Sequence, residues 1–235
     1  MNTKELYGLR EVSCVVSGVS LSLPIKGLLD RLFIRQPRLT GWPPWIDSRS
    51  FMDASAWPYV KDGGWEALIR NLRTNWAIGE VDFWRIEPNG RFYAARTYED
   101  DTSRTRLGAG CKPGTTLDFL LLITRAAEQM AVARAFADAM GADPTKAELN
   151  FAFRWSGLAG RSIDSWVEPL RSILFSVKAV NKEAASQVSM RLDTPDSALP
   201  KLVQKATQPV FDVFGAGVGM PVYEEMVNRT LQRRL

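Results

Sequence analysis

Two β-prone segments, VDFWRIE (residues 81–87) and RFYAARTY (residues 91–98), are separated only by Pro88-Asn89-Gly90. Asn-Gly readily supplies the positive φ angles that tight turns between antiparallel strands require. Aromatic and β-branched residues on both sides of such a turn predict a β-hairpin over Val81 to Tyr98 that turns at Asn89-Gly90. The chain is therefore expected to contain an antiparallel sheet, to which the remaining strands and helices must be added.

A long helix follows this hairpin in the sequence. Thr115 or Thr116 can cap its first turn, and Gly141 and Pro144 end it after Met140. Its first half is apolar nearly all round and its second half is rich in alanine, which predicts a central helix that its neighbours approach closely. We expect the core to include Leu120, Leu121 and Ile123.

The other elements follow from the spacing of the apolar residues. Strands are predicted at residues 11–21, 146–155, 172–180 and 186–193. Helices are predicted at residues 24–36, 64–76, 198–215 with a break at Pro209, and 222–235, with the glycine-rich GAGVG (residues 215–219) as a linker. Together they predict an α+β fold: a mixed, mainly antiparallel sheet with a long central helix and further helices packed on it, in a single domain over residues 1–235.

Composition excludes several classes of chemistry. The chain has no histidine, which removes the commonest general base, the usual metal ligand and every Ser-His or Cys-His nucleophile pair. Its two cysteines, Cys14 and Cys111, lie too far apart in sequence to form a zinc site, and no acidic cluster has the spacing of a calcium loop. We expect both cysteines to be unpaired thiols in a reducing compartment, and we expect no catalytic residue, metal or cofactor.

The termini and the charge balance add little to this. The N-terminus lacks the basic and apolar regions of a secretory signal, so the chain is expected in the cytoplasm. The run Leu117 to Ile123 is far shorter than the ~20 residues that span a bilayer. A net charge of +4, from 30 basic and 26 acidic residues, is too small to imply nucleic acid by itself.

Residues 38–61 have no periodicity but hold several prolines and aromatic residues. This composition predicts an irregular segment packed by its own aromatic side chains rather than a disordered linker. Within it, TGWPPW (residues 40–45) fixes two indoles around consecutive prolines. Trp42 and Trp45 either cover the edge of the core or are offered to a ligand or partner.

Glu99, Asp100 and Asp101 form the one acidic run, inside the polar segment 99–114. We expect a solvated loop in which these carboxylates pair with nearby arginines, namely Arg96, Arg104 and Arg106. Metal-assisted hydrolysis would need further carboxylates that converge from elsewhere in the chain. A histidine-free hydrolase built on this run is accordingly the third candidate function.

Four segments together resemble a known group of proteins: TGWPPW, VDFWRIEPNGRFYAARTYEDD, LDFLLLITRAAEQMAVARAFADAMG and FRWSGLAGRSI. They are similar to the C-terminal region that follows the AlbA-type domain in prokaryotic Schlafen-like proteins, which are described as DNA-binding or transcriptional regulators. The resemblance runs from about Leu28 to Phe214. Because the AlbA-type domain has no counterpart here, we expect this module alone or a free-standing relative, and the resemblance implies a sensor or assembly role.

We predict a non-enzymatic sensing or protein-interaction domain that controls a separate DNA-binding or defence effector, through a protein partner or self-association. Aromatic and arginine anchors are what binding sites favour, and the predicted contacts are Trp42, Trp45, Trp57, Arg85, Arg96 and Arg161. The alternative is a nucleic-acid-binding module that uses arginine-rich loops and the aromatic residues of the hairpin, Phe83, Trp84, Phe92 and Tyr93.

Overall fold

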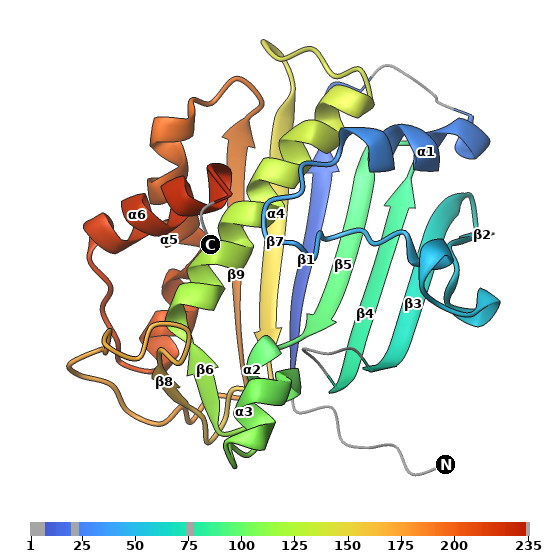
Figure 1. Ribbon diagram of the computed structural model, residues 1–235. Coiled ribbons are helices and arrows are strands. Elements are labelled where there is room, and N and C mark those ends of the chain that lie inside the picture. The colour runs from blue at the N-terminus through green and yellow to red at the C-terminus, as the bar shows by residue number, and fades with distance from the viewer. Residues whose placement is uncertain (1–7, 20–23, 74–77, 234–235) are drawn as a thin grey trace.

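Figure 1 presents the computed structural model, which describes residues 8–19, 24–73 and 78–233. Within these ranges seven strands form one sheet in the order β2-β3-β4-β5-β1-β7-β9, and every neighbouring pair is antiparallel. The strands are β1 (Leu9–Val16), β2 (Tyr59–Lys61), β3 (Gly64–Arg73), β4 (Ile78–Glu87), β5 (Arg91–Thr97), β7 (Glu148–Ser156) and β9 (Glu183–Arg191). The first strand of the sequence thus lies inside the sheet, between β5 and β7.

The main helices lie together on one face of this sheet (Figure 1). α4 (Phe119–Ala139) runs across the middle of the strands, and α1 (Ile25–Arg35) lies on the side of β3 and β4. α5 (Leu199–Val213) and α6 (Met220–Leu231) lie on the side of β9. Two short helices, α2 (Glu99–Thr102) and α3 (Arg104–Gly108), and a small parallel pair of strands, β6 (Thr116–Asp118) and β8 (Ser162–Asp164), complete the fold near one end of the sheet.

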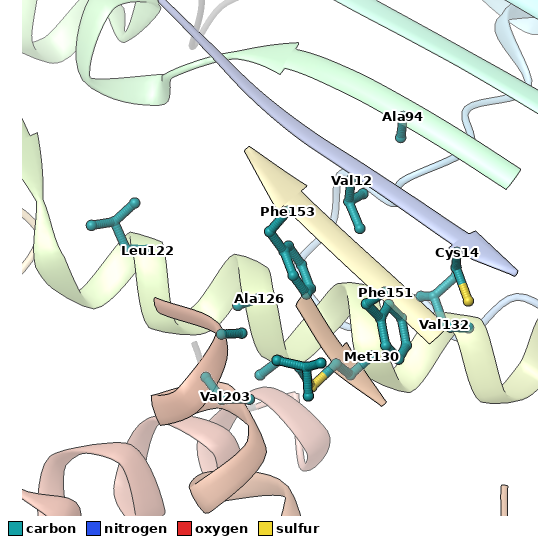
Figure 2. Close-up of a cluster of buried hydrophobic side chains, with 14 of the residues drawn as sticks. Val12, Cys14, Ala94, Leu122, Ala126, Met130, Val132, Phe151, Phe153 and Val203 are labelled. Carbon is teal, nitrogen blue, oxygen red and sulfur yellow. The ribbon is translucent and has the colours of Figure 1, made fainter. Parts of the chain in front are cut away.

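The core lies between the sheet and α4. In β7 the predicted alternation is confirmed, since its apolar side chains are buried while Glu148 and Arg154 are exposed. Figure 2 shows Phe151 and Phe153 beside Met130 and Val132 of α4, and the two phenyl rings stack with centroids 5.8 Å apart. This cluster joins strands from both halves of the sheet to the helices.

The predicted α+β fold, with a mainly antiparallel sheet and a long helix, is confirmed. The hairpin of β4 and β5 pairs Glu87 with Arg91, and the turn between them is Pro88-Asn89-Gly90. Gly90 has φ 82°, whereas Asn89 has a negative φ. We expected a positive φ at both residues of the turn, but only Gly90 adopts one. This is the geometry of a three-residue hairpin loop with glycine in the left-handed region.

The prediction of a helix at residues 64–76 is wrong, because Gly64–Arg73 forms strand β3. Every second side chain of this strand, at Trp65, Ala67 and Ile69, points toward the helices. A short apolar run considered without the strands that pair with it fits a helix equally well. Pairing with β4 on one side and β2 on the other decides the matter. Tertiary hydrogen bonding thus overrides an ambiguous local pattern.

Three other predictions also need correction. Residues 172–180 form no strand but belong to an irregular segment between β8 and β9. Pro209 lies inside a continuous α5 and does not break it. Leu121 is only half-buried, although its neighbours Leu120 and Ile123 lie in the core as predicted.

In the described part of the chain, no helix is long and apolar enough to cross a membrane.

Candidate interaction surface

Trp42 and Arg96, two of the six predicted contact residues, lie together, and both bind the buried side chain of Asp82. The Trp42 indole donates to Asp82 at 3.0 Å, and the Arg96 guanidinium donates to the same carboxylate at 2.6 Å. Arg96 also donates to the carbonyl oxygens of Trp42 and Pro43. The arginine therefore holds the irregular segment 38–61 against the hairpin.

Trp45 and Arg161, two further predicted contact residues, are also internal. Trp45 is 1% exposed and packs edge-on between Phe92 and Phe136, with centroids 5.1 and 5.5 Å away. Arg161 is fully buried and donates to both carboxylate oxygens of Asp101, at 2.9 and 2.6 Å. Of the two readings of TGWPPW, the structure places Trp45 in the core.

Arg85 and Trp57 lie at the β2 side of the sheet. Arg85 bridges Glu66 and Glu87 and donates to the carbonyl oxygen of Asp62 at 3.1 Å. Trp57 is 42% exposed, although its indole nitrogen donates to Met52. Of the six predicted residues, Trp57 alone presents a large ring to solvent, beside the exposed side chains of Phe51, Tyr59 and Val60.

The acidic run is not a solvated loop, so this prediction is wrong. Glu99 contacts the guanidiniums of Arg10 and Arg125, at 3.2 and 2.8 Å. Burial alone would raise the pKa of Glu99, but the two arginines outweigh burial and hold its pKa well below its usual range. The partners come from β1 and α4 rather than from the neighbouring arginines that the sequence suggested.

Asp100, the next residue, is buried without a basic partner of its own. Its Oδ1 accepts hydrogen bonds from the backbone N–H of Asp118 at 2.7 Å and from the Trp166 indole at 2.9 Å. Burial raises the pKa of Asp100 to about 7; the Trp166 hydrogen bond lowers it, while the charges of Asp118 and Glu99 raise it further. These carboxylates organise the end of the sheet, and no group of three or more acidic or cysteine residues in the described ranges has the geometry to hold a metal ion.

Residues 165–182, which connect β8 to β9 and are here called the apolar loop, carry the most exposed large apolar side chains of the described chain. Leu170 is fully exposed, Leu174 and Val180 are each 86% exposed, Phe175 is 82% exposed and Val177 is 62% exposed. Monomeric proteins rarely offer several large apolar side chains to water in one segment without a binding role. The alternating apolar pattern of residues 172–180 predicts a strand, and so this exposed surface is not expected from the sequence.

The apolar loop is firmly anchored at both ends. At its start, the buried Asp118 carboxylate caps α4 with Oδ1 and accepts from the backbone N–H groups of Trp166 and Val167 with Oδ2, at 2.8 and 3.0 Å. Near its end, the backbone N–H of Val177 donates to the carbonyl oxygen of Phe214, and the backbone N–H of Ala179 donates to the carbonyl oxygen of Arg161. A surface held in this way loses less conformational entropy when it binds.

Ion pairs fix the middle of the apolar loop to α6. Glu168 pairs with Arg171 at 2.7 Å and with Arg229, and Arg171 also reaches Glu225 at 2.7 Å. Beside them lies a hollow of about 660 Å³, which Arg171 and Ser172 line together with apolar and glycine residues that include Phe119, Leu170, Leu174, Phe175, Gly217 and Val222. The loop thus combines projecting apolar side chains with a recess that could receive an apolar side chain.

The hairpin aromatic residues do not form a stacking platform for bases. Trp84 and Phe92 lie in the core. Phe83 and Tyr93 lie on the other face of the sheet with their rings 5.9 Å apart, and the Tyr93 hydroxyl donates to Glu11 at 2.6 Å. A carboxylate beside these half-buried rings disfavours a phosphate backbone.

Comparisons with protein-family models, curated proteins and solved structures gave no match to this chain.

Proposed function

We propose that this chain is a non-enzymatic protein-interaction module and that the apolar loop is its contact surface. The observation that carries the proposal is the exposure of Leu170, Leu174, Phe175 and Val180 on a segment fixed at both ends. Burial of apolar surface is the dominant favourable contribution to most protein–protein association, and a preformed surface loses less conformational entropy when it binds. The resemblance to Schlafen-like proteins adds the proposal that the partner is a DNA-binding or defence effector.

The nucleic-acid alternative has weaker support. Arg85 and Arg96 are both paired with carboxylates, and the outward aromatic pair Phe83 and Tyr93 lies beside Glu11. Non-specific binding of nucleic acid needs basic side chains that remain available for phosphates. The apolar loop presents mainly apolar groups, which suit a protein surface better.

The test replaces two exposed side chains of the loop together, Leu174→Ser and Phe175→Ser. The tagged wild-type chain and the variant are used to capture proteins from a lysate of the source organism, and captured proteins are identified by mass spectrometry. Any specific partner is then purified and its affinity measured by calorimetry. We expect the double variant to lose on the order of 2 kcal/mol or more of binding free energy.

Ile34→Ser is the matched control, because Ile34 is 83% exposed on α1, away from the loop. It should retain the partner, and all variants should unfold at the wild-type temperature. A partner that binds the loop variant as tightly as the wild type would contradict the proposed surface. If a nucleic acid rather than a protein is recovered, and binds the loop variant equally well, the alternative function is favoured.

A further inference from the structure

The two edges of the sheet differ in how well they are protected. At one edge, β2 has three residues and runs into a turn at Asp62-Gly63, where Arg85 donates to the Asp62 carbonyl. At the other edge, β9 has nine residues, pairs with β7 along its whole length without a register shift, and contains no proline or lysine. Within the described residues β9 pairs with no other strand. Proteins usually block such long, regular edges, because the unpaired backbone groups bind other strands.

The hydrogen-bond pattern identifies which backbone groups of β9 are unpaired. Leu192 N–H donates to Ala147 at 3.0 Å across the β7 ladder. Because antiparallel ladders alternate, the even-numbered residues of β9 bond to β7 and the odd-numbered residues point away from it. On the other side of β7, the backbone N–H of Ser17 donates to the carbonyl oxygen of Glu148. The even-numbered residues of β7 therefore bond to β1 and its odd-numbered residues bond to β9, which agrees with this assignment. The N–H and C=O groups of Ala185, Gln187 and Ser189 therefore face the open edge, and these three residues are exposed.

We propose that the β9 edge binds the β9 edge of a second copy of this chain, antiparallel, about a two-fold axis at Gln187. In this register Glu183 faces Arg191 of the second copy, Ala185 faces Ser189, and Gln187 faces its own counterpart. All of these residues have outward backbone groups, so each facing pair can exchange two N–H···O hydrogen bonds. A two-fold axis repeats every contact, so the strand has to be complementary to itself.

The side chains of β9 meet that requirement. Facing residues of an antiparallel pair project from the same face of the sheet, and the odd-numbered residues all project from the face opposite the helices. The arrangement places two Glu183–Arg191 pairs at the ends and small or uncharged side chains between them. Opposite charges directly across two strands stabilise the pairing, whereas like charges would oppose it.

On the helix side, the surface beside β9 is hollowed. A two-fold axis perpendicular to the sheet keeps the helices of both copies on one side. There, a hollow of about 900 Å³ lies between β9 and α5, lined by residues that include Met190, Leu202 and Pro209. Met190, which in this register faces Ala184 of the second copy, lines this hollow. Lys201 and Lys205 on its wall are exposed and lie on the helix rather than in the strand.

This inference goes beyond the proposed function and does not depend on it, since it uses β9 rather than the apolar loop. The two ideas can therefore fail separately. The variant with Leu174→Ser and Phe175→Ser should lose its external partner and still dimerise.

The test is sedimentation velocity over a concentration series of the purified chain. We expect the wild type to form a dimer and Gln187→Pro to remain a monomer, because proline removes an outward N–H that the β7 ladder does not use. Gln187→Ala is the matched control and should dimerise like the wild type. Circular dichroism of the proline variant should match that of the wild type.

A charge reversal tests the register even if the proline variant fails to fold. Arg191→Glu places like charges opposite each other twice and should raise the dimer dissociation constant about tenfold or more. Adding Glu183→Arg to Arg191→Glu restores both facing pairs and should return the dissociation constant to within about threefold of the wild-type value. The double reversal cannot restore the ion pairs within one chain, Glu183 with Arg154 and Arg191 with Asp193. A recovered dissociation constant would therefore come from contacts with the second copy.

Two outcomes would overturn the inference. The first is a chain that stays monomeric throughout the series, including the case in which another protein adds its strand to β9 instead. The second is a dimer whose dissociation constant is unchanged by Gln187→Pro and by Arg191→Glu, since that dimer must use another surface.

Discussion

At the scale of single residues, three consecutive acidic positions have three different roles. Glu99 is held by Arg10 and Arg125, Asp101 is paired with the buried Arg161, and Asp100 has only neutral donors. Because Asp100 is buried without a cation, its negative charge is destabilising in the folded chain. The electrostatic environment therefore differs sharply between adjacent side chains.

Asp100→Asn should stabilise the chain at neutral and alkaline pH. The folded pKa of Asp100, about 7, lies above its ordinary value of 3.8, so the folded chain binds more protons between these pH values. The contribution of Asp100 to stability is thus fully present below pH 3.8 and is lost as the pH rises through 7. An asparagine oxygen can accept the same two hydrogen bonds without this loss.

We expect the unfolding free energy of Asp100→Asn minus that of the wild type to rise by ~2–4 kcal/mol between acidic and neutral pH. Urea unfolding of both proteins at each pH measures this difference. Asp101→Asn is the neighbouring control. It leaves Arg161 buried and unpaired, and should destabilise by ~3–5 kcal/mol at neutral pH. A stability difference for Asp100→Asn that does not vary with pH would contradict the raised pKa.

The tryptophans of the irregular segment also divide by burial. Trp45→Ala removes a ring enclosed by Phe92 and Phe136 and should cost ~3–5 kcal/mol of unfolding free energy. Trp57→Ala removes a partly exposed ring and should cost less than half of that. Thermal and urea unfolding of the two variants side by side measure this. Equal losses would mean that Trp57 supports the fold as much as Trp45 does.

At the scale of secondary-structure elements, the turn of the hairpin is the most demanding position. Gly90 has a positive φ, and a Cβ atom there would lie 2.9 Å from Val19 Cγ2 and 3.2 Å from the Val16 carbonyl oxygen. Gly90→Val combines this contact with a β-branched side chain in the left-handed region and should cost ~1–3 kcal/mol. Asn89→Ala, at negative φ, is the control and should cost less; an unchanged melting temperature for Gly90→Val would be inconsistent with this turn.

Elements far apart in sequence meet at the start of the apolar loop. Asp118 ends β6, caps α4 and holds Trp166 and Val167, so one carboxylate fixes a helix terminus and the candidate interaction surface together. Capping of this kind supplies acceptors to N–H groups that a helix leaves unpaired. The exposed side chains of the loop are thus presented by a rigid base.

At the scale of the whole molecule, the helices cover one face of the sheet and leave one long edge open. If β9 pairs with a second copy, mass action links folding to association, and the melting temperature should rise with protein concentration. Differential scanning fluorimetry over a dilution series measures this. The melting temperature of Gln187→Pro should not depend on concentration, and a wild-type melting temperature that is equally independent would argue against the dimer.

Local chemistry alone determined several parts of this protein. Asn-Gly between two aromatic-rich segments was enough to place the hairpin, because the turn needs only its own residues. The continuous apolar and alanine-rich pattern of α4 and the strict alternation of β7 also predicted these elements correctly. In each case the signal is long or stereochemically specific, and few alternative structures compete with it. The predicted cap of α4 at Thr115 or Thr116 is wrong, because Asp118 caps the helix and Thr116 lies in β6.

The tertiary structure decided the rest. β3 is a strand because β2 and β4 pair with it, and residues 172–180 stay irregular because in the described chain no strand pairs with them. The acidic run is buried because its arginines arrive from β1, α4 and the segment before β8, which lie far away in sequence. Burial, charge pairing and exposure depend on which distant segments meet, and the spacing of neighbouring residues carries no information about that.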